Sequence, residues 1–165
     1  MALVQAPLDA PLAERLSRAP GAGVTLYWLG QAGFVIDAQE RRIVIDPYLS
    51  DTLAQKYRDT PHSHARMAPP PVSAEQLGSV DLVLCTHHHT DHMDGETLQR
   101  LAVRQPALKF VVPAASAFLA SQRIGVGLDR LIQVDAGQNL DFPGFGLRVM
   151  RAAHETLERN VDGHH

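Results

Sequence analysis

The sequence predicts an α/β layered fold, in which short strands alternate with helices. An alternating apolar pattern runs from Val24 through Leu26 to Trp28, as expected for a strand with one face on a core. Residues 94–102 and 114–123 are expected to form helices. Further short apolar and β-branched runs, each expected to be a strand, cover 34–36, 43–45, 80–84, 110–113, 131–134 and 147–149. Strands that alternate with helices are typical of this fold class.

The first residues differ in composition from the rest. Residues 1–22 contain several prolines and are expected to form an arm that lies on the domain, with a short helix from Pro11 to Ser17. The domain itself is expected to occupy residues 23–165. A chain of 165 residues is long enough to bury a core of its own.

Turn and cap residues separate the expected elements. The polar stretch Gln39–Arg42 lies between two strand runs, which are therefore expected to pair as a hairpin. Asp94 is expected to cap the first of the two later helices, and Gly125 is expected to end the second.

Composition argues against several classes of partner. The net charge is −3 and aromatic residues make up 5% of the chain, so the basic patch with aromatics that nucleic-acid binding requires is absent. No apolar stretch is long enough to span a bilayer, and the N-terminus lacks the layout of a signal peptide. The single cysteine, Cys85, cannot form an internal disulfide, and we expect it to be a packed thiol in a cytoplasmic protein.

The stretch that carries chemistry is Thr86–His92, which follows a buried apolar run. Neutral imidazole and carboxylate are preferred ligands of Zn²⁺ and similar divalent ions. A loop that leaves a rigid strand can point His87 and His89 to one side, while Asp91 and His92 curl back beside them. Such an arrangement suits two metal ions bridged by a water. The alternative is a histidine-rich loop without ligands, but the strand-to-loop context favours a metal site.

The run from His87 to His92 matches H-x-H-x-D-H, the motif of the metallo-β-lactamase superfamily, which this sequence resembles. Residues 28–34 followed by 43–47 look like the opening hairpin of the branch that contains ascorbate-6-phosphate lactonase. Residues 152–155 are similar to the superfamily's next metal-ligand position, which would make His154 the third histidine ligand. The resemblance implies a metallo-β-lactamase-type αββα sandwich.

Only the first half of that sandwich is expected here. By resemblance, the second half supplies an aspartate that bridges both metals and a last histidine, and nothing downstream of His154 offers them in the expected context. His164 and His165 are not assigned to the site. The sequence is then either a fragment of a longer protein or a short version completed by another subunit. A half-sandwich leaves an apolar sheet face uncovered, and a homo-oligomer is one way to cover it.

The resemblance implies a metal-dependent hydrolase that uses a metal-activated water on a lactone or another small ester, with or without a phosphate group. His87, His89 and His154 would hold the first metal, while Asp91 and His92 begin the second site. Asp91 would also orient the nucleophile and relay its proton. Zn²⁺ and Mn²⁺ fit these ligands, and Fe²⁺ fits them as well. Two alternatives stay open, a phosphodiesterase of the same superfamily and a non-catalytic metal-binding or assembly module.

Two further regions are candidates for supporting roles. By resemblance, Asp46 is a carboxylate that supports the histidine loop from behind, although a simple turn residue is the alternative. The irregular residues 51–79 resemble an insertion that lies beside the active site in the lactonase-like branch. There His62, His64 and Arg66 would meet an anionic substrate, Arg66 by a bidentate contact. The alternative is a solvated lid with incidental histidines.

Overall fold

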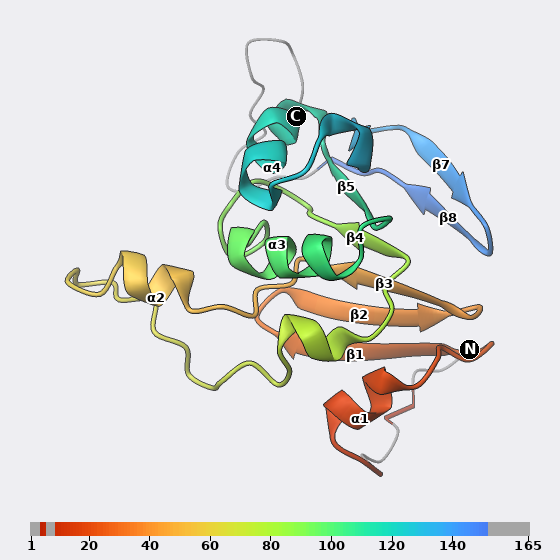
Figure 1. The fold of residues 1–165 in the computed structure, drawn as a ribbon, viewed down its shortest axis with the longest axis horizontal. Coiled ribbons are helices and arrows are strands. Elements are labelled where there is room, and N and C mark those ends of the chain that lie inside the picture. The colour runs from red at the N-terminus through yellow and green to blue at the C-terminus, as the bar shows by residue number, and fades with distance from the viewer. Residues whose placement is uncertain (1–3, 6–8, 152–165) are drawn as a thin grey trace.

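The computed structural model describes residues 4–5 and 9–151. One six-stranded sheet organises them, with its strands in chain order from β1 to β6 (Figure 1). The first three strands are antiparallel and the last three continue the sheet in parallel. The strands are β1 Val24–Gly30, β2 Gly33–Ala38, β3 Arg41–Ile45, β4 Leu82–Leu84, β5 Lys109–Pro113 and β6 Leu131–Val134. The predicted α/β fold is confirmed.

Helices cover one face of the sheet, and the main core lies between the two layers. The helices are α1 Leu12–Ser17, α2 Thr52–Lys56, α3 Gly95–Arg104 and α4 Ala117–Ile124, and the 3-10 turns are η1 Ala74–Leu77, η2 Ala114–Ser116 and η3 Leu128–Arg130. On the sheet, register places one apolar side chain from each of four neighbouring strands in a buried row, Val35, Val44, Val83 and Phe110. Leu98 and Leu101 of α3 are fully buried in the same cluster.

The opposite face of the sheet is only partly covered. A separate ribbon of β7 Asn139–Phe142 and β8 Phe145–Arg148 packs over β4, β5 and β6. A second apolar row crosses all six strands on this face, Trp28, Phe34, Ile45, Leu84, Val111 and Ile132. The exposed fraction is 3% at Val111, beneath the ribbon, and 63% at Trp28. Among residues 4–5 and 9–151, the ribbon covers this face at its β6 end and nothing covers it at its β1 end.

The N-terminal arm is attached to the domain by Arg42. Its side chain is 1% exposed and pairs with Asp37 through Nε at 2.7 Å. The same guanidinium donates to the backbone carbonyls of Leu16, Arg18 and Leu77. The predicted arm helix is present as α1, and its Leu16 is buried in the main core.

Two sequence predictions need correction, and one strand was missed. The hairpin turn is shorter than Gln39–Arg42, because only its first two residues have positive φ while Arg41 and Arg42 belong to β3. Asp94 occupies the N-cap of α3 without a capping bond, and its carboxylate instead accepts the Thr97 hydroxyl at 2.5 Å. The strand β7 was not predicted.

The predicted helix over 114–123 begins as η2 and continues as α4, and Gly125 ends it in the left-handed region as expected. Within the described ranges, no helix is long and apolar enough to cross a membrane.

Candidate metal centre

The histidine loop, residues 86–92, follows β4 at the carboxyl end of the parallel part of the sheet. Register pairs Ile45 of β3 with Leu84 of β4, so the residues that follow the two strands lie side by side. The Asp46 N–H donates to the Leu84 carbonyl at 2.9 Å, which extends this pairing by one step. Sheet register therefore brings Asp46 to the base of a loop whose sequence begins 40 residues later at Thr86.

Asp46 holds both ends of the histidine loop. Its side chain is buried, and Oδ1 accepts the Thr86 backbone N–H at 2.7 Å. Oδ2 accepts the Thr86 hydroxyl at 2.6 Å and lies 2.7 Å from Nδ1 of His92. The carboxylate thus lies behind the loop, in the place that the resemblance implied, although its role toward a metal stays a prediction.

The backbone around Asp46 is adapted to this position. Its φ is 43°, in the left-handed region that aspartate tolerates better than most residues. A Cβ on Gly33 would lie 3.1 Å from the Asp46 carbonyl oxygen, which is tighter than ordinary packing allows. Glycine at this position lets β2 approach the strand end that carries the carboxylate.

The Asp46 network determines which ring nitrogen carries the proton in His87 and in His92. The Thr86 hydroxyl donates its proton to Asp46, so its oxygen can accept a hydrogen bond from Nδ1–H of His87, 3.1 Å away. His92 likewise donates from Nδ1–H to Asp46. In each neutral imidazole the lone pair is then on Nε2, the nitrogen that can bind a metal.

The hydrogen bond that His92 donates to Asp46 raises the pKa of His92 above its usual value. Partial burial opposes this shift, and the charges of Asp46 and Asp91 add to it. Without metal, the imidazolium form of His92 is therefore favoured over a wider pH range than in an exposed histidine. A metal ion that binds Nε2 must displace that proton.

The imidazole rings of the loop gather on one side. The ring centroid of His87 lies 4.0 Å from that of His92 and 4.7 Å from that of His89. Asp91 is half-buried, and its Oδ2 lies 3.7 Å from Nε2 of His92. His88 is also close, with its ring 5.1 Å from the His89 ring. The structure brings together the loop residues that the sequence predicted.

Residues 4–5 and 9–151 contain no group of three or more His, Cys, Asp or Glu side chains arranged to hold one ion. The predicted third histidine, His154, lies outside these residues, as do His164 and His165. The donor chemistry nevertheless fits a divalent metal, because imidazole nitrogens and a carboxylate are adjacent and Asp46 orients His92 from the far side.

Cys85 directly precedes the loop in the chain and is a packed thiol, as predicted. The side chain is buried in the main core. Burial strongly raises the pKa of this thiol, and the nearby charge of Asp46 raises it further. A thiol held in its neutral form is neither a good metal ligand nor a nucleophile.

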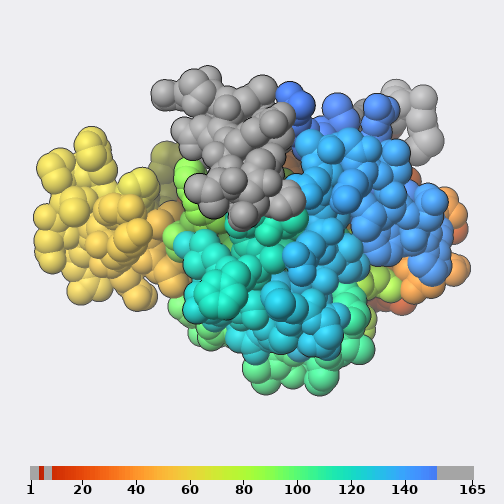
Figure 2. Space-filling view, turned by 90° about the horizontal axis from the view of Figure 1, so that it is seen from above, coloured from red at the N-terminus to blue at the C-terminus, as the bar shows by residue number. Residues whose placement is uncertain are grey.

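The excursion that contains α2 begins at the same sheet edge as the loop and projects from one end of the molecule (Figures 1 and 2). His62 and His64 are exposed on it, and the His64 ring lies 4.5 Å from the Tyr57 ring. Arg66 is held differently. Its guanidinium lies 4.3 Å from the Tyr48 ring centroid and donates to the carbonyls of Tyr48 and Ser50.

These contacts give Arg66 a clear structural role, since they fasten the return of the excursion to the chain that follows β3. Its side chain is 8% exposed and also pairs with Asp51 at 3.4 Å. The predicted contacts of Arg66, His62 and His64 with a substrate stay predictions.

Comparison with known proteins identifies the family. A family model described as a beta-lactamase superfamily domain matches residues 25–164. The chain belongs to the metallo-β-lactamase superfamily. It is 28% identical over 123 residues to N-acyl-phosphatidylethanolamine-hydrolyzing phospholipase D 1 of Caenorhabditis elegans. This match covers 73% of this chain and 34% of that protein. It is 31% identical over 124 residues to a UPF0173 metal-dependent hydrolase of Hyperthermus butylicus, with coverage of 74% and 46%.

Among solved structures, the metallo hydrolase Igni18 of Ignicoccus hospitalis is similar in fold, with a TM-score of 0.53 and 21% sequence identity. The likeness covers 84% of this chain and 52% of Igni18. The chain therefore spans between about a third and about half the length of these superfamily members. The branch that contains ascorbate-6-phosphate lactonase is not distinguished by these relatives.

Two residues that support the superfamily motif were missed in the sequence. Thr86 links Asp46 to His87, as described above. Arg123, in the last turn of α4, donates a guanidinium N–H to the carbonyl of His88. Thr86 could have been found because it precedes the motif directly, whereas no local pattern connects Arg123 with a loop 35 residues away.

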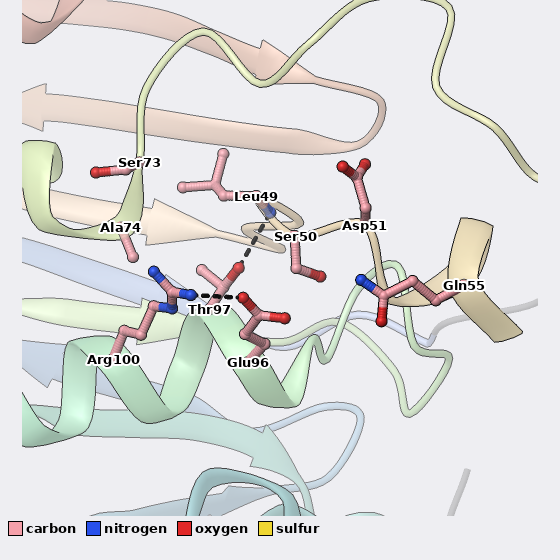
Figure 3. A pocket seen from close by; sticks show the side chains of 9 residues that line it. All are labelled: Leu49, Ser50, Asp51, Gln55, Ser73, Ala74, Glu96, Thr97 and Arg100. Atoms are coloured by element: carbon pink, nitrogen blue, oxygen red, sulfur yellow. Dashed lines mark hydrogen bonds and ion pairs between the residues drawn. The ribbon is translucent and has the colours of Figure 1, made fainter.

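A polar hollow of about 220 Å³ lies beside α3 (Figure 3). It is lined by Leu49, Ser50, Asp51, Gln55, Ser73, Ala74, Glu96, Thr97 and Arg100, and none of the predicted site residues is among them. Two internal contacts cross it, from the Leu49 N–H to the Thr97 hydroxyl at 3.1 Å and from Arg100 to Glu96 at 2.7 Å. The first contact joins α3 to the segment that follows Asp46, whereas the second lies within α3.

Proposed function

We propose that this chain binds a divalent metal at the histidine loop and contributes to hydrolysis of a lactone or another small ester, with or without a phosphate group. The observation that carries the proposal is the Asp46 network, which orients the imidazoles of His87 and His92 from the side opposite their Nε2 atoms. A carboxylate behind a histidine has this role in metal sites because it fixes the tautomer and the ring orientation.

His87, His89 and His154 would hold one ion, and Asp91 with His92 would begin a second site. When bound, the metal supplies Lewis acidity, which lowers the pKa of a coordinated water and polarises a carbonyl or phosphoryl oxygen. With two protein ligands against three, the second site should bind its ion more weakly. Zn²⁺, Mn²⁺ and Fe²⁺ all suit this set of nitrogen and oxygen donors.

The chain's own residues prepare the reaction. His92 directs Nδ1 toward Asp46. Its Nε2 then faces Asp91, whose Oδ2 lies 3.7 Å away. The half-buried carboxylate of Asp91 can orient an attacking water and take its proton at Oδ2. The leaving group would then receive that proton from the same oxygen.

A phosphodiester is the second candidate substrate, since the Caenorhabditis elegans relative is named as a phospholipase D that hydrolyses N-acyl-phosphatidylethanolamine. A non-catalytic metal-binding module is the third reading. The expected cytoplasmic location also stays a prediction.

One assay series distinguishes these functions. The purified chain is loaded with Zn²⁺ or Mn²⁺ and given a simple lactone and bis-p-nitrophenyl phosphate side by side. His87→Ala combined with His89→Ala should abolish both metal binding and turnover, because it removes two adjacent imidazoles. His88→Ala is the matched control, and it should leave metal content nearly unchanged because the motif does not use this side chain as a ligand.

Faster turnover of the lactone supports the ester proposal, and faster turnover of the phosphodiester selects the second candidate. Metal binding without turnover of either substrate indicates a binding module. Full metal content by elemental analysis in the double variant would refute the ligand assignment.

A further inference from the structure

The middle of the histidine loop is held by a residue from another element. An N–H of the Arg123 guanidinium donates to the carbonyl oxygen of His88. This carbonyl belongs to the peptide that joins His88 to His89, so its direction sets ψ of the first residue and φ of the second. The direction of this peptide therefore determines how the His89 ring lies relative to the His87 ring, which is 4.7 Å away.

Arg123 is itself fixed by contacts that do not involve its side chain. Gln99 Nε2 of α3 donates to the Arg123 carbonyl at 2.7 Å. Gly95, the first residue of α3, approaches so closely that a Cβ there would lie 3.2 Å from the same carbonyl oxygen. The last turn of α4 thus packs against the first turn of α3, the helix that begins just after the loop. The guanidinium therefore extends from a backbone that contacts with α3 hold in place.

Other hydrogen bonds hold the two ends of the loop and its second half. Asp46 holds Thr86 and His92, and the His89 carbonyl accepts the N–H groups of His92 and Met93 at 3.0 and 2.8 Å. The contact from Arg123 meets the stretch between these ends, at the residue between two predicted ligands.

We propose that Arg123 is a positioning residue for the metal ligands His87 and His89, acting through the His88 carbonyl. The inference rests on the proposed function, because it assigns the loop's purpose to metal binding. Arg123 does not touch the metal or the substrate in this role. It limits rotation of the His88–His89 peptide so that both imidazoles are presented together.

Two simpler explanations predict different results. A cation in the last turn of α4 also interacts favourably with the helix dipole, and that role would affect helix stability alone. A cation near a metal site repels the metal, so a role through charge alone means that removing Arg123 strengthens metal binding. Positioning predicts the opposite sign, because a loop with a freer central peptide must be ordered when the metal binds.

The test compares Arg123→Gln and Arg123→Lys with Arg104→Gln, which removes an exposed arginine from the last turn of α3. Zn²⁺ affinity is measured by competition with a chromophoric chelator. Thermal unfolding and amide hydrogen exchange are measured on the metal-free proteins. The exchange readout follows the His92 and Met93 N–H groups, whose common acceptor is the His89 carbonyl.

In Arg123→Gln we expect Zn²⁺ binding about tenfold weaker, the lower end of the range for groups that orient ligands. Exchange at His92 and Met93 should be several-fold faster, with little change in the unfolding temperature of the metal-free chain. Arg123→Lys keeps the charge and should recover part of the affinity, while Arg104→Gln should match the wild type.

Unchanged or tighter Zn²⁺ binding in Arg123→Gln overturns the proposal, and so does unchanged exchange at the two amides. A fall in unfolding temperature that accounts for the whole loss of affinity also overturns it, in favour of a purely structural role. If the wild-type chain binds no metal, the proposed function fails, and the exchange comparison still decides whether Arg123 fixes the loop.

Discussion

Asp46→Asn is the most informative single substitution, because the buried carboxylate accepts hydrogen bonds from three donors. It accepts the Thr86 N–H, the Thr86 hydroxyl and Nδ1–H of His92 at 2.6–2.7 Å. Asparagine has the same shape, but one of its two oxygens becomes an NH₂ group. If that group faces His92, the imidazole must accept at Nδ1 and carry its proton on Nε2. The substitution then removes the lone pair that the metal needs.

The magnitude follows from the same contacts. Hydrogen bonds to a charged acceptor contribute about 1.5–3 kcal/mol each, but three bonds to one carboxylate are not additive. We expect the metal-free chain to lose about 2–4 kcal/mol of unfolding free energy, since asparagine retains part of the network. Metal affinity should fall about 10- to 100-fold, as for other groups that orient metal-binding histidines.

The assay pairs Zn²⁺ titration against a chelator with urea unfolding of the metal-free protein. Asp37→Asn is the matched control, because Asp37 is also a buried carboxylate with charged hydrogen bonds, from Arg42. The pair of Asp37 and Arg42 is separate from the Asp46 network, because about 13 Å of extended backbone lies between Arg42 and Asp46. The control should lose stability and keep its metal affinity. Wild-type affinity in Asp46→Asn, or an equal loss in both variants, would refute the reasoning.

Stability, pH and association offer three further tests. Because the folded-state pKa of His92 is raised above 6.5, its contact with Asp46 should stabilise the metal-free chain fully below about that pH. This stabilisation should be lost as the pH rises through the folded-state pKa, and thermal unfolding of wild type and Asp46→Asn across neutral pH measures it. Arg42→Met should cost about 3–5 kcal/mol in urea unfolding, because it leaves a buried carboxylate unpaired. We propose that a second copy covers the open end of the sheet, so Trp28→Glu should lower the mass seen by light scattering, and a monomeric wild type would contradict this.

Much of the fold could be predicted because its apolar runs have clear periods and clear ends. The alternation from Val24 to Trp28 predicted β1, and Gly125 marked the end of α4. The ribbon strand β7 was missed because its apolar residues are only half-buried and alternate with polar ones over four positions. So short a pattern is weak without its partner strand.

The site was predictable to a different degree. The histidine motif is local in sequence, so its gathering of rings could be expected. The position of Asp46 needed the resemblance, because a polar residue before a proline is equally typical of a turn. The resemblance implied a substrate contact for Arg66, which stays a prediction, and most of its contacts in the structure are to backbone carbonyls and to the Tyr48 ring. A guanidinium has several donors, and the backbone competes with any ligand for them.

Arg42 and Asp46 show why the remaining assignments required the structure. Both are polar residues that flank the same apolar run of β3, and nothing in that run distinguishes them. Arg42 lies beside the arm and η1, where backbone carbonyls meet it, so it becomes a structural anchor. Asp46 lies beside the end of β4, where N–H, hydroxyl and imidazole donors meet it, so it becomes the support of the histidine loop. Their roles depend on which neighbours the sheet register brings to each end of the strand, and register is a property of pairing between strands.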